Sequence, residues 1–302
     1  MKGVEAGEQV HLAEVEEAAA KNSVARLSIL AAAFLVALKT VTGLMTGSIS
    51  VWASLLDSTM DIFASTINFI AVRVASRPAD EDHSYGHGKA ESLAGLFQAA
   101  VITASGIFLI WEAVRRLRQP HEVRSEWAGI TTMMIAIAVS AGLVVRLRSI
   151  ARKTESPALS SDAIHYASDI YTNSGALLAL LIIKLSGFKV VDPLISILIS
   201  LYILWSAASV ARESVDVLMD RRLPAEVDEQ IANIVGRYRE YGIFGFHDLR
   251  TRRSGSHKFI DLHLEVAGDK SLEEAHDLTV RVLREIESEI PRSHVQIHTD
   301  PI

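Results

Sequence analysis

Two pairs of ionisable residues interrupt long apolar stretches of this sequence. Asp57 and Asp61 are four residues apart in one stretch, and His165 and Asp169 have the same spacing in another. Residues at positions i and i+4 lie on the same face of a helix. An ionisable group inside a membrane costs about 2.5–3.5 kcal/mol, so these four residues imply a compensating partner. A bound cation is the simplest such partner.

Three carboxylates and one imidazole would make a tetrahedral oxygen–nitrogen site that suits Zn²⁺ and admits Cd²⁺, Fe²⁺ or Co²⁺. Asp61 and Asp169 each lie near the middle of a helix, so antiparallel pairing of the two helices would bring both pairs to one depth. Two alternatives stay open. The four groups could hydrogen-bond one helix to the other, although Ser, Thr or Asn more often does so. They could also form a proton relay that binds no metal.

A polar loop follows the first of these apolar stretches and reads Pro-Ala-Asp-Glu-Asp-His-Ser-Tyr-Gly-His-Gly-Lys-Ala-Glu over residues 78–91. Asp80, His83 and His87 could together ligate one metal ion. On spacing alone, a solvated polar loop is an equal alternative.

The C-terminal part of the chain carries further groups that could ligate a metal: His247, His263, His276, His298 and Asp300. His298 and Asp300 are two residues apart on a predicted strand, so they point to the same side. Scattered histidines are more often surface or core residues than ligands, and we interpret His257 and His294 as surface residues.

Six apolar segments have the length of about 20 residues that a bilayer crossing needs. They lie near 24–46, 49–75, 93–117, 127–147, 158–185 and 190–213. Gly47 and Ser48 separate the first two segments, which predicts a helical hairpin. Six crossings place both termini on one side, and the excess of Lys and Arg on that side predicts cytoplasmic termini. Arg115, Arg116, Arg118 and Arg124 oppose this topology, because they would lie outside.

The chain after Arg212 has the charged composition of a soluble domain. Its pattern predicts a helix at Ala225–Glu240, strands at Phe246–Arg252 and Lys258–Val266, a helix at Ser271–Glu289 and a strand at His294–Thr299. In the middle strand apolar and polar residues alternate, as in a sheet with one buried face. The order αββαβ is typical of a small α+β domain.

The predicted fold is therefore an α-helical membrane protein with six transmembrane helices and a C-terminal cytoplasmic α+β domain. The expected parts are a cytoplasmic N-terminal segment at 1–23, a transport domain at 24–213 and a metal-binding, dimerising domain at 214–302. The first segment is acidic and lacks the basic region and cleavage site of a secretory signal, so we interpret it as an amphipathic cytoplasmic helix.

Charge and cysteine content exclude several classes of function. The formal net charge of −6 gives no basic surface for nucleic acid. The chain has no cysteine, so it forms no disulfide and offers no thiolate ligand, which disfavours Cu(I).

The sequence resembles a known family, the cation diffusion facilitators, and particularly their bacterial ferrous-iron and zinc efflux members. The resemblance extends from about Ala20 to Pro301. It rests on Ser54-Leu55-Leu56-Asp57-Ser58 with Asp61, on Pro78-Ala79-Asp80, on His83-Ser84-Tyr85-Gly86-His87-Gly88-Lys89-Ala90-Glu91-Ser92, on His165 with Asp169, on Asp220-Arg221, on His247-Asp248-Leu249-Arg250-Thr251-Arg252 and on His298-Thr299-Asp300-Pro301.

The resemblance implies a function for each group of residues. Asp57, Asp61, His165 and Asp169 would form the transport site, and Asp80, His83 and His87 a second site. The cytoplasmic domain would hold two zinc ions, one on His247 and His263, the other on His276 and His298, with Asp300 between them. Relatives often have Gln where this chain has Thr299, whose carbonyl or hydroxyl would be a neutral ligand. Lys89 would pair with Asp220 and lock the membrane and soluble parts together at the dimer interface.

We therefore expect a multi-pass protein of the bacterial inner membrane that exports divalent cations, with zinc as both substrate and resident ion. It would work as a homodimeric Zn²⁺/H⁺ antiporter in the lipid bilayer, a secondary active transporter and not an enzyme. The alternatives are an exporter of Mn²⁺ or Fe²⁺, a metal sensor that does not transport, and an intramembrane metalloenzyme. The apolar segments hold no His-Glu-x-x-His motif, which disfavours the enzyme.

Overall fold

The computed structural model describes residues 2–46, 49–118, 127–186, 188 and 190–302. The side chains of residues 2–14, 43, 46, 49–57, 60, 128 and 184 lie outside the described part. The chain divides into two compact units, Met1–Val215 and Asp216–Ile302. Each unit is described by itself below.

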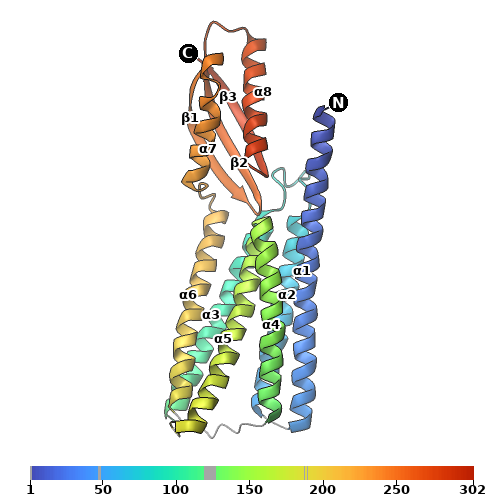
Figure 1. Cartoon of the computed structure of the whole chain (residues 1–302), viewed down its shortest axis with the longest axis vertical. Helices are drawn as coiled ribbons and strands as arrows, with labels where there is room; N and C mark the ends of the chain where they lie inside the picture. The colour runs from blue at the N-terminus through green and yellow to red at the C-terminus, as the bar shows by residue number, and fades with distance from the viewer. Residues whose placement is uncertain (1, 47–48, 119–126, 187, 189) are drawn as a thin grey trace. The chain divides into compact units, whose positions relative to one another are not determined.

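The first unit consists of long helices that run side by side (Figure 1). The helices are α1 (Lys2–Thr46), α2 (Ile49–Ala75), α3 (Lys89–Arg118), α4 (Trp127–Thr154), α5 (Pro157–Ser186) and α6 (Val191–Leu218). Within the described residues, α1, α3, α4, α5 and α6 each hold a segment long and apolar enough to cross a membrane. The side chains of α2 are described over only part of its length, and its sequence is as apolar as that of the others. The predicted turn at Gly47 and Ser48 lies outside the described residues.

The helix expected within residues 1–23 is present, and it continues without a break as α1 from Lys2 to Thr46. The physical reason is in the sequence. This stretch holds no proline and is rich in Ala and Glu, both of which have high helix propensity. A change from polar to apolar composition marks a change of surroundings and does not require the helix to end.

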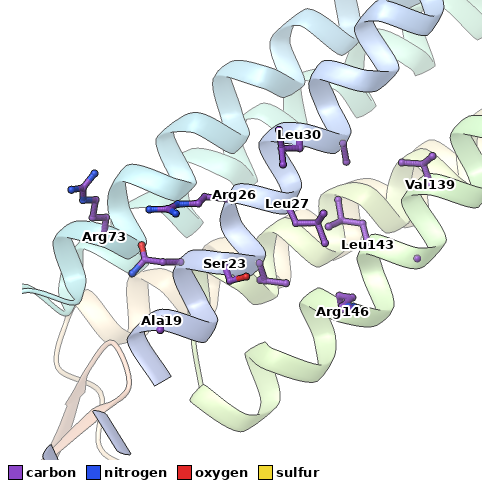
Figure 2. A pocket seen from close by; sticks show the side chains of 13 residues that line it. Ala19, Ser23, Arg26, Leu27, Leu30, Arg73, Val139, Leu143 and Arg146 are labelled. Atoms are coloured by element: carbon purple, nitrogen blue, oxygen red, sulfur yellow. The ribbon is translucent and has the colours of Figure 1, made fainter. Parts of the chain in front are cut away.

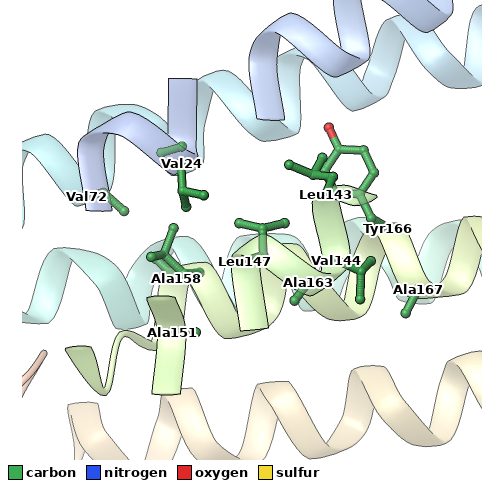
Figure 3. Close-up of a cluster of buried hydrophobic side chains, with 12 residues drawn as sticks. Val24, Val72, Leu143, Val144, Leu147, Ala151, Ala158, Ala163, Tyr166 and Ala167 are labelled. Carbon is green, nitrogen blue, oxygen red and sulfur yellow. The ribbon is translucent and has the colours of Figure 1, made fainter. Parts of the chain in front are cut away.

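Close packing of small residues holds α1, α2, α4 and α5 together. Figure 3 shows the buried cluster, in which Leu147 of α4 and Val72 of α2 face alanines of α5. Alanine is frequent on both sides of the α4–α5 contact, at positions 151, 158, 163 and 167. Small side chains let membrane helices approach closely, which gains dispersion contacts where no hydrophobic effect acts between helices.

Glycine has the same role where α5 meets α6. A methyl group added at Gly175 of α5 would overlap Ile199 of α6 and lie 3.1 Å from Cγ2 of Ile195. With Ile199 in its present position, the contact between these two helices leaves no room for a side chain at position 175.

The second unit is an α+β domain. Its elements are α7 (Ala225–Gly236), a 3₁₀ turn η1 (Arg239–Tyr241), β1 (Ile243–Ser254), β2 (His257–Val266), α8 (Leu272–Glu289) and β3 (Ser293–Pro301). The sheet has the order β1-β2-β3, with β1 antiparallel and β3 parallel to β2. The predicted first helix ends earlier than expected, at Gly236, and the chain continues into the 3₁₀ turn.

Both helices of this unit cover one face of the sheet (Figure 1). Ile260, Leu262, Leu264 and Val266 of β2 are at most 1% exposed, as their alternation predicts. They pack with Ile234 of α7 and Val282 of α8. Ser271 and Glu274 form a capping box at the start of α8. The predicted fold class, membrane helices followed by an α+β domain, is confirmed.

Candidate functional site

The first group of ligating side chains lies between α2 and α5, inside the helical unit. Nε2 of His165 is 3.0 Å from Oδ1 of Asp61, and both residues are less than 10% exposed. Asp169 joins them, with the ligating atoms of the three residues all within 4.8 Å of one another. The pairing of these two helices agrees with the arrangement that the sequence predicts. The side chain of Asp57 lies outside the described residues, so its place in the group stays a prediction.

This group has the composition of a divalent-cation site. Two carboxylates and an imidazole offer oxygen and nitrogen donors at distances that one ion could span. In a buried setting the carboxylates need a cation or a hydrogen-bond donor close by. His165 lies close enough to Asp61 to be this donor or cation. A bound metal ion would also compensate the charge of the carboxylates.

Asp162 is a buried acidic residue that the sequence analysis missed. Its carboxylate is fully buried and accepts a hydrogen bond of 2.6 Å from the hydroxyl of Ser28 on α1. The hydroxyl of Tyr166 donates to the backbone carbonyl of Ser28 and lies 3.0 Å from the hydroxyl of Ser65 on α2. A polar network thus links α1, α2 and α5 beside the candidate site. The signal in the sequence was the position of Asp162, one helical turn before His165.

Glu91, which the sequence analysis treated only as part of the loop motif, is the centre of a second buried polar contact. Its side chain is 3.1 Å from Nζ of Lys21 on α1 and accepts a hydrogen bond from the hydroxyl of Ser156. Ser156 also accepts a hydrogen bond from the backbone N–H of Leu159, in the first turn of α5. These contacts join the start of α3, the start of α5 and α1 at one end of the unit.

The loop between α2 and α3 gathers Asp80, His83 and His87. The two carboxylate oxygens of Asp80 lie 3.2 Å from Nδ1 of His83 and 3.3 Å from Nε2 of His87. The backbone N–H of His83 donates to Asp80 and holds the pKa of that carboxyl below its ordinary value. Gly86, with a φ of +75°, supplies the left-handed turn that lets the chain fold back. The three side chains form one group that could hold a metal ion.

In the second unit, three histidines form a row across the sheet. His247 of β1 pairs with His263 of β2, which pairs with His298 of β3. The carboxylate of Asp300 contacts all three rings, at 3.3, 2.9 and 3.3 Å respectively. The hydrogen bond from His263 is the main cause that lowers the pKa of the Asp300 carboxyl. The row lies on the face of the sheet that the helices do not cover, because its neighbours Leu262 and Leu264 point into the core.

Two residues of this region lie differently from what the sequence suggested, and one was missed. His276 is exposed on α8 and joins none of the ligating groups found among the described residues, so its role as a ligand stays a prediction. The hydroxyl of Thr299 is 2.9 Å from that of Thr279 on α8, so it points away from the histidine row. Asp248 was missed as a ligand candidate and groups with His247 and His263. It occupies a β-bulge with a φ of +50°, which no sequence pattern predicts.

The predicted pair of Lys89 and Asp220 is divided between the two units. Lys89 is the first residue of α3, and Asp220 lies 3.6 Å from the guanidinium of Arg252 within the second unit. Their pairing stays a prediction.

A bundle of membrane-crossing helices with a ligating group between two of them, followed by a domain with further ligating groups, defines a transporter of metal cations. Comparison with known families agrees. Residues 25–219 match the cation efflux transmembrane domain, and residues 223–302 match the cation efflux protein cytoplasmic domain. The chain belongs to the cation efflux family, the cation diffusion facilitators. It is a cation efflux transporter and not an enzyme.

Two relatives agree with this assignment. The chain is 42% identical over 256 residues to the cation-efflux pump FieF of Yersinia pestis (strain Pestoides F), an alignment that covers 85% of this chain and 84% of the relative. FieF of Yersinia pseudotuberculosis serotype I gives the same values. Among solved structures, the metal-bound C-terminal domain of the CzcD transporter from Thermotoga maritima is 29% identical and covers 26% of this chain and 88% of that one, with a TM-score of 0.24.

Proposed function

We propose that this chain is a Zn²⁺/H⁺ antiporter that moves zinc out of the cytoplasm across the bacterial inner membrane, as a homodimer with cytoplasmic termini. The observation that carries the proposal is the buried contact of His165 with Asp61, with Asp169 beside them, between α2 and α5. Asp57 would complete the set of four ligands for the transported ion.

The donor set supports zinc as the substrate. Carboxylates alone favour hard cations such as Mn²⁺, whereas imidazole favours Zn²⁺ and its neighbours in the transition series. His165 shifts the preference of the group toward zinc.

Exchange for protons follows from the chemistry of the ligands. An imidazole must be neutral and a carboxylate ionised before either can hold a metal ion, so binding releases protons and protonation releases metal. Two protons taken up by the site would replace one Zn²⁺ with little change in the total charge, which limits the cost of the unloaded site inside the membrane.

The groups outside the membrane helices would hold resident zinc ions. Asp80, His83 and His87 would bind one ion at the loop. In the second unit, the row of His247, His263 and His298 with Asp300 would bind zinc on the open face of the sheet, with His276 as the further ligand that the family resemblance implies. Lys89 and Asp220 would form the lock between the membrane and soluble parts.

The test is a flux measurement on the purified full-length chain in proteoliposomes, with a zinc-sensitive dye and a pH-sensitive dye enclosed in separate preparations. We expect zinc entry into the vesicles to drive protons out. A proton gradient that is more acidic outside the vesicles should slow zinc entry. Parallel measurements with Fe²⁺, Mn²⁺, Cd²⁺ and Co²⁺ rank the substrates.

Three results would contradict the proposal. Equal zinc flux with the proton gradient imposed, abolished or reversed would indicate a channel or uniporter. Faster flux of Fe²⁺ or Mn²⁺ at equal concentration would assign another physiological substrate. Zinc binding without flux of any ion would indicate a sensor.

A further inference from the structure

A cavity of about 990 Å³ opens between α1, α2 and α4, apart from every ligating group described above. Three arginines line it, one from each helix: Arg26, Arg73 and Arg146. The rest of the lining includes four large apolar side chains, Leu27 and Leu30 of α1 and Val139 and Leu143 of α4. Figure 2 shows Arg26 and Arg73 toward one end of the cavity and Leu30 and Val139 toward the other. We call this space the arginine cavity.

The arginine cavity lies at the cytoplasmic end of the helices. Lys21 of α1 meets Glu91 at the start of α3, and Gly95 of α3 lies directly against Ser214 near the end of α6. Because α6 leads into the cytoplasmic domain, this end of the unit faces the cytoplasm. Arg26 follows Lys21 by five residues, or about 7.5 Å along the helix, so Arg26 lies near this end of the unit.

The three guanidinium groups lack anionic partners within the described part of the chain. No carboxylate of the described residues forms an ion pair with Arg26, Arg73 or Arg146, in contrast to Arg115 and Arg116 at the other end, which pair with Glu112. The guanidinium of Arg26 instead lies over the ring of Phe69, 5.8 Å from its centre. All three arginines are exposed, so an anion from outside the protein can reach their guanidinium groups.

We propose that the arginine cavity binds an anionic glycerophospholipid of the cytoplasmic leaflet. Its phosphodiester would lie among Arg26, Arg73 and Arg146, where guanidinium groups donate pairs of hydrogen bonds to phosphate oxygens. One acyl chain would lie along Leu27, Leu30 and Leu143.

The arginines and the apolar side chains of the cavity together favour an anionic phospholipid as the ligand. A soluble phosphate would satisfy the arginines and leave the apolar half without an occupant. A zwitterionic lipid carries its own ammonium group, which competes with the arginines for its phosphate. An anionic phospholipid is complementary to both halves, and the cavity opens between helices that cross the leaflet where such lipids reside.

The test compares lipids on the purified full-length chain in neutral detergent. Native mass spectrometry and thermal unfolding measure retention and stabilisation by phosphatidylglycerol, with phosphatidylcholine as the zwitterionic reference. The test variant is Arg26→Gln, Arg73→Gln and Arg146→Gln together, which keeps most of the side-chain packing. The matched control is Arg77→Gln, Arg148→Gln and Arg152→Gln, which removes the same charge from the same end of the unit but from outside the cavity.

We expect wild type to prefer phosphatidylglycerol, the test variant to bind it about 100-fold more weakly, and the control to resemble wild type. Equal loss in both triple variants would assign the preference to general surface charge and overturn the proposal. Retention of the wild-type preference in the test variant would do the same. Stabilisation by glycerol phosphate equal to that by phosphatidylglycerol would make this a site for soluble phosphate and overturn the assignment to lipid.

Discussion

Asp61 and Asp169 would be charged ligands of the proposed transport site. Replacing either by Asn removes a negative charge from inside the membrane while keeping the size and shape of the side chain. We expect Asp61→Asn and Asp169→Asn to lower zinc flux in proteoliposomes by at least about 100-fold, because a charged ligand is lost, and to leave expression equal or higher.

Asp192→Asn is the matched control for these two variants. Asp192 lies at the start of α6 and pairs with Arg116, away from the ligating group. Wild-type flux in Asp61→Asn or Asp169→Asn would place the transport site elsewhere. A loss in Asp192→Asn as large as in the two test variants would indicate a general effect of removing charge from the helices.

Spacing was sufficient to propose Asp61, His165 and Asp169 together, because i, i+4 pairs place ionisable groups on single faces of apolar helices, where their burial must be compensated. It was insufficient for Asp162, whose burial depends on Ser28 of a distant helix. It was also insufficient for the row of His247, His263 and His298, because the alignment of those strands depends on pairings that no local pattern encodes. Local periodicity predicts which face a residue occupies, and tertiary packing decides what lies opposite.

At the scale of elements, the contact of α5 with α6 depends on the absence of a side chain at one position. We expect Gly175→Ala to destabilise the protein by about 1–3 kcal/mol, because the added methyl group overlaps Ile199 and approaches Ile195. The matched control is Gly129→Ala on α4, where no atom of the described residues lies within 4 Å of the added carbon. Gain of helix propensity favours alanine at both positions, so the control should be neutral or up to about 1 kcal/mol more stable.

Thermal unfolding in detergent, followed by circular dichroism, measures both variants. A Tm of Gly175→Ala equal to or above that of Gly129→Ala would show that α5 and α6 adjust to the methyl group without cost.

An ion pair that links the end of α7 to α8 should make the stability of the second unit depend on pH. Just after α7, Arg237 donates hydrogen bonds to Glu289 of α8, which lowers the pKa of that carboxyl below its ordinary value of 4.5. A lowered pKa in the folded state means that the pair stabilises fully above about pH 4.5 and that its contribution is lost as the pH falls through the folded value. Arg237→Gln should therefore be less stable than wild type at pH 7, and the difference should shrink below pH 4.5.

Urea unfolding of the second unit at a series of pH values measures this effect. Arg284→Gln is the control, since it removes the same charge from α8 without removing an ion pair that the described residues form. A difference between wild type and Arg237→Gln that is constant from pH 7 to pH 3 would contradict the role of this pair.

Prediction of the elements themselves succeeded where periodicity is strong. The alternation in β2 and the apolar length of α3 to α6 are properties of single segments, and both were recognised. The change of composition near residue 23 marks the start of the apolar segment and not a helix end, since α1 runs through it. The 3₁₀ turn after Gly236 was not predicted. It ends at Gly242, whose left-handed φ of +96° leads the chain into β1, and no local pattern indicates this φ.

At the scale of the whole molecule, the second unit has its own hydrophobic core and capped helix, so we expect a fragment of about residues 218–302 to fold alone. It should bind two Zn²⁺ per chain and gain stability from them, because ions that bind only the folded form shift the unfolding equilibrium. His263→Ala should lower the stoichiometry measured by calorimetry, since His263 contacts Asp300 in the centre of the row.

His257→Ala is the matched control, because the ring of His257 stacks on His294 and joins none of the ligating groups among the described residues. Absence of zinc binding by the wild-type fragment would remove resident cytoplasmic zinc from the proposed function. An equal loss of bound zinc in His263→Ala and His257→Ala would contradict the assignment of the ions to the histidine row.

The unbroken course of α1 gives the molecule a mechanical element. Its 45 residues extend over about 68 Å, more than twice the hydrocarbon thickness of about 30 Å. The contact of Lys21 with Glu91 is a point about which α1 could tilt. The part of α1 from Lys2 to Lys21 is about 28 Å long. A tilt of about 10° at that point would displace the far tip by about 5 Å. A rearrangement of the membrane helices that tilted α1 in this way would produce a movement that a pair of spin labels could resolve.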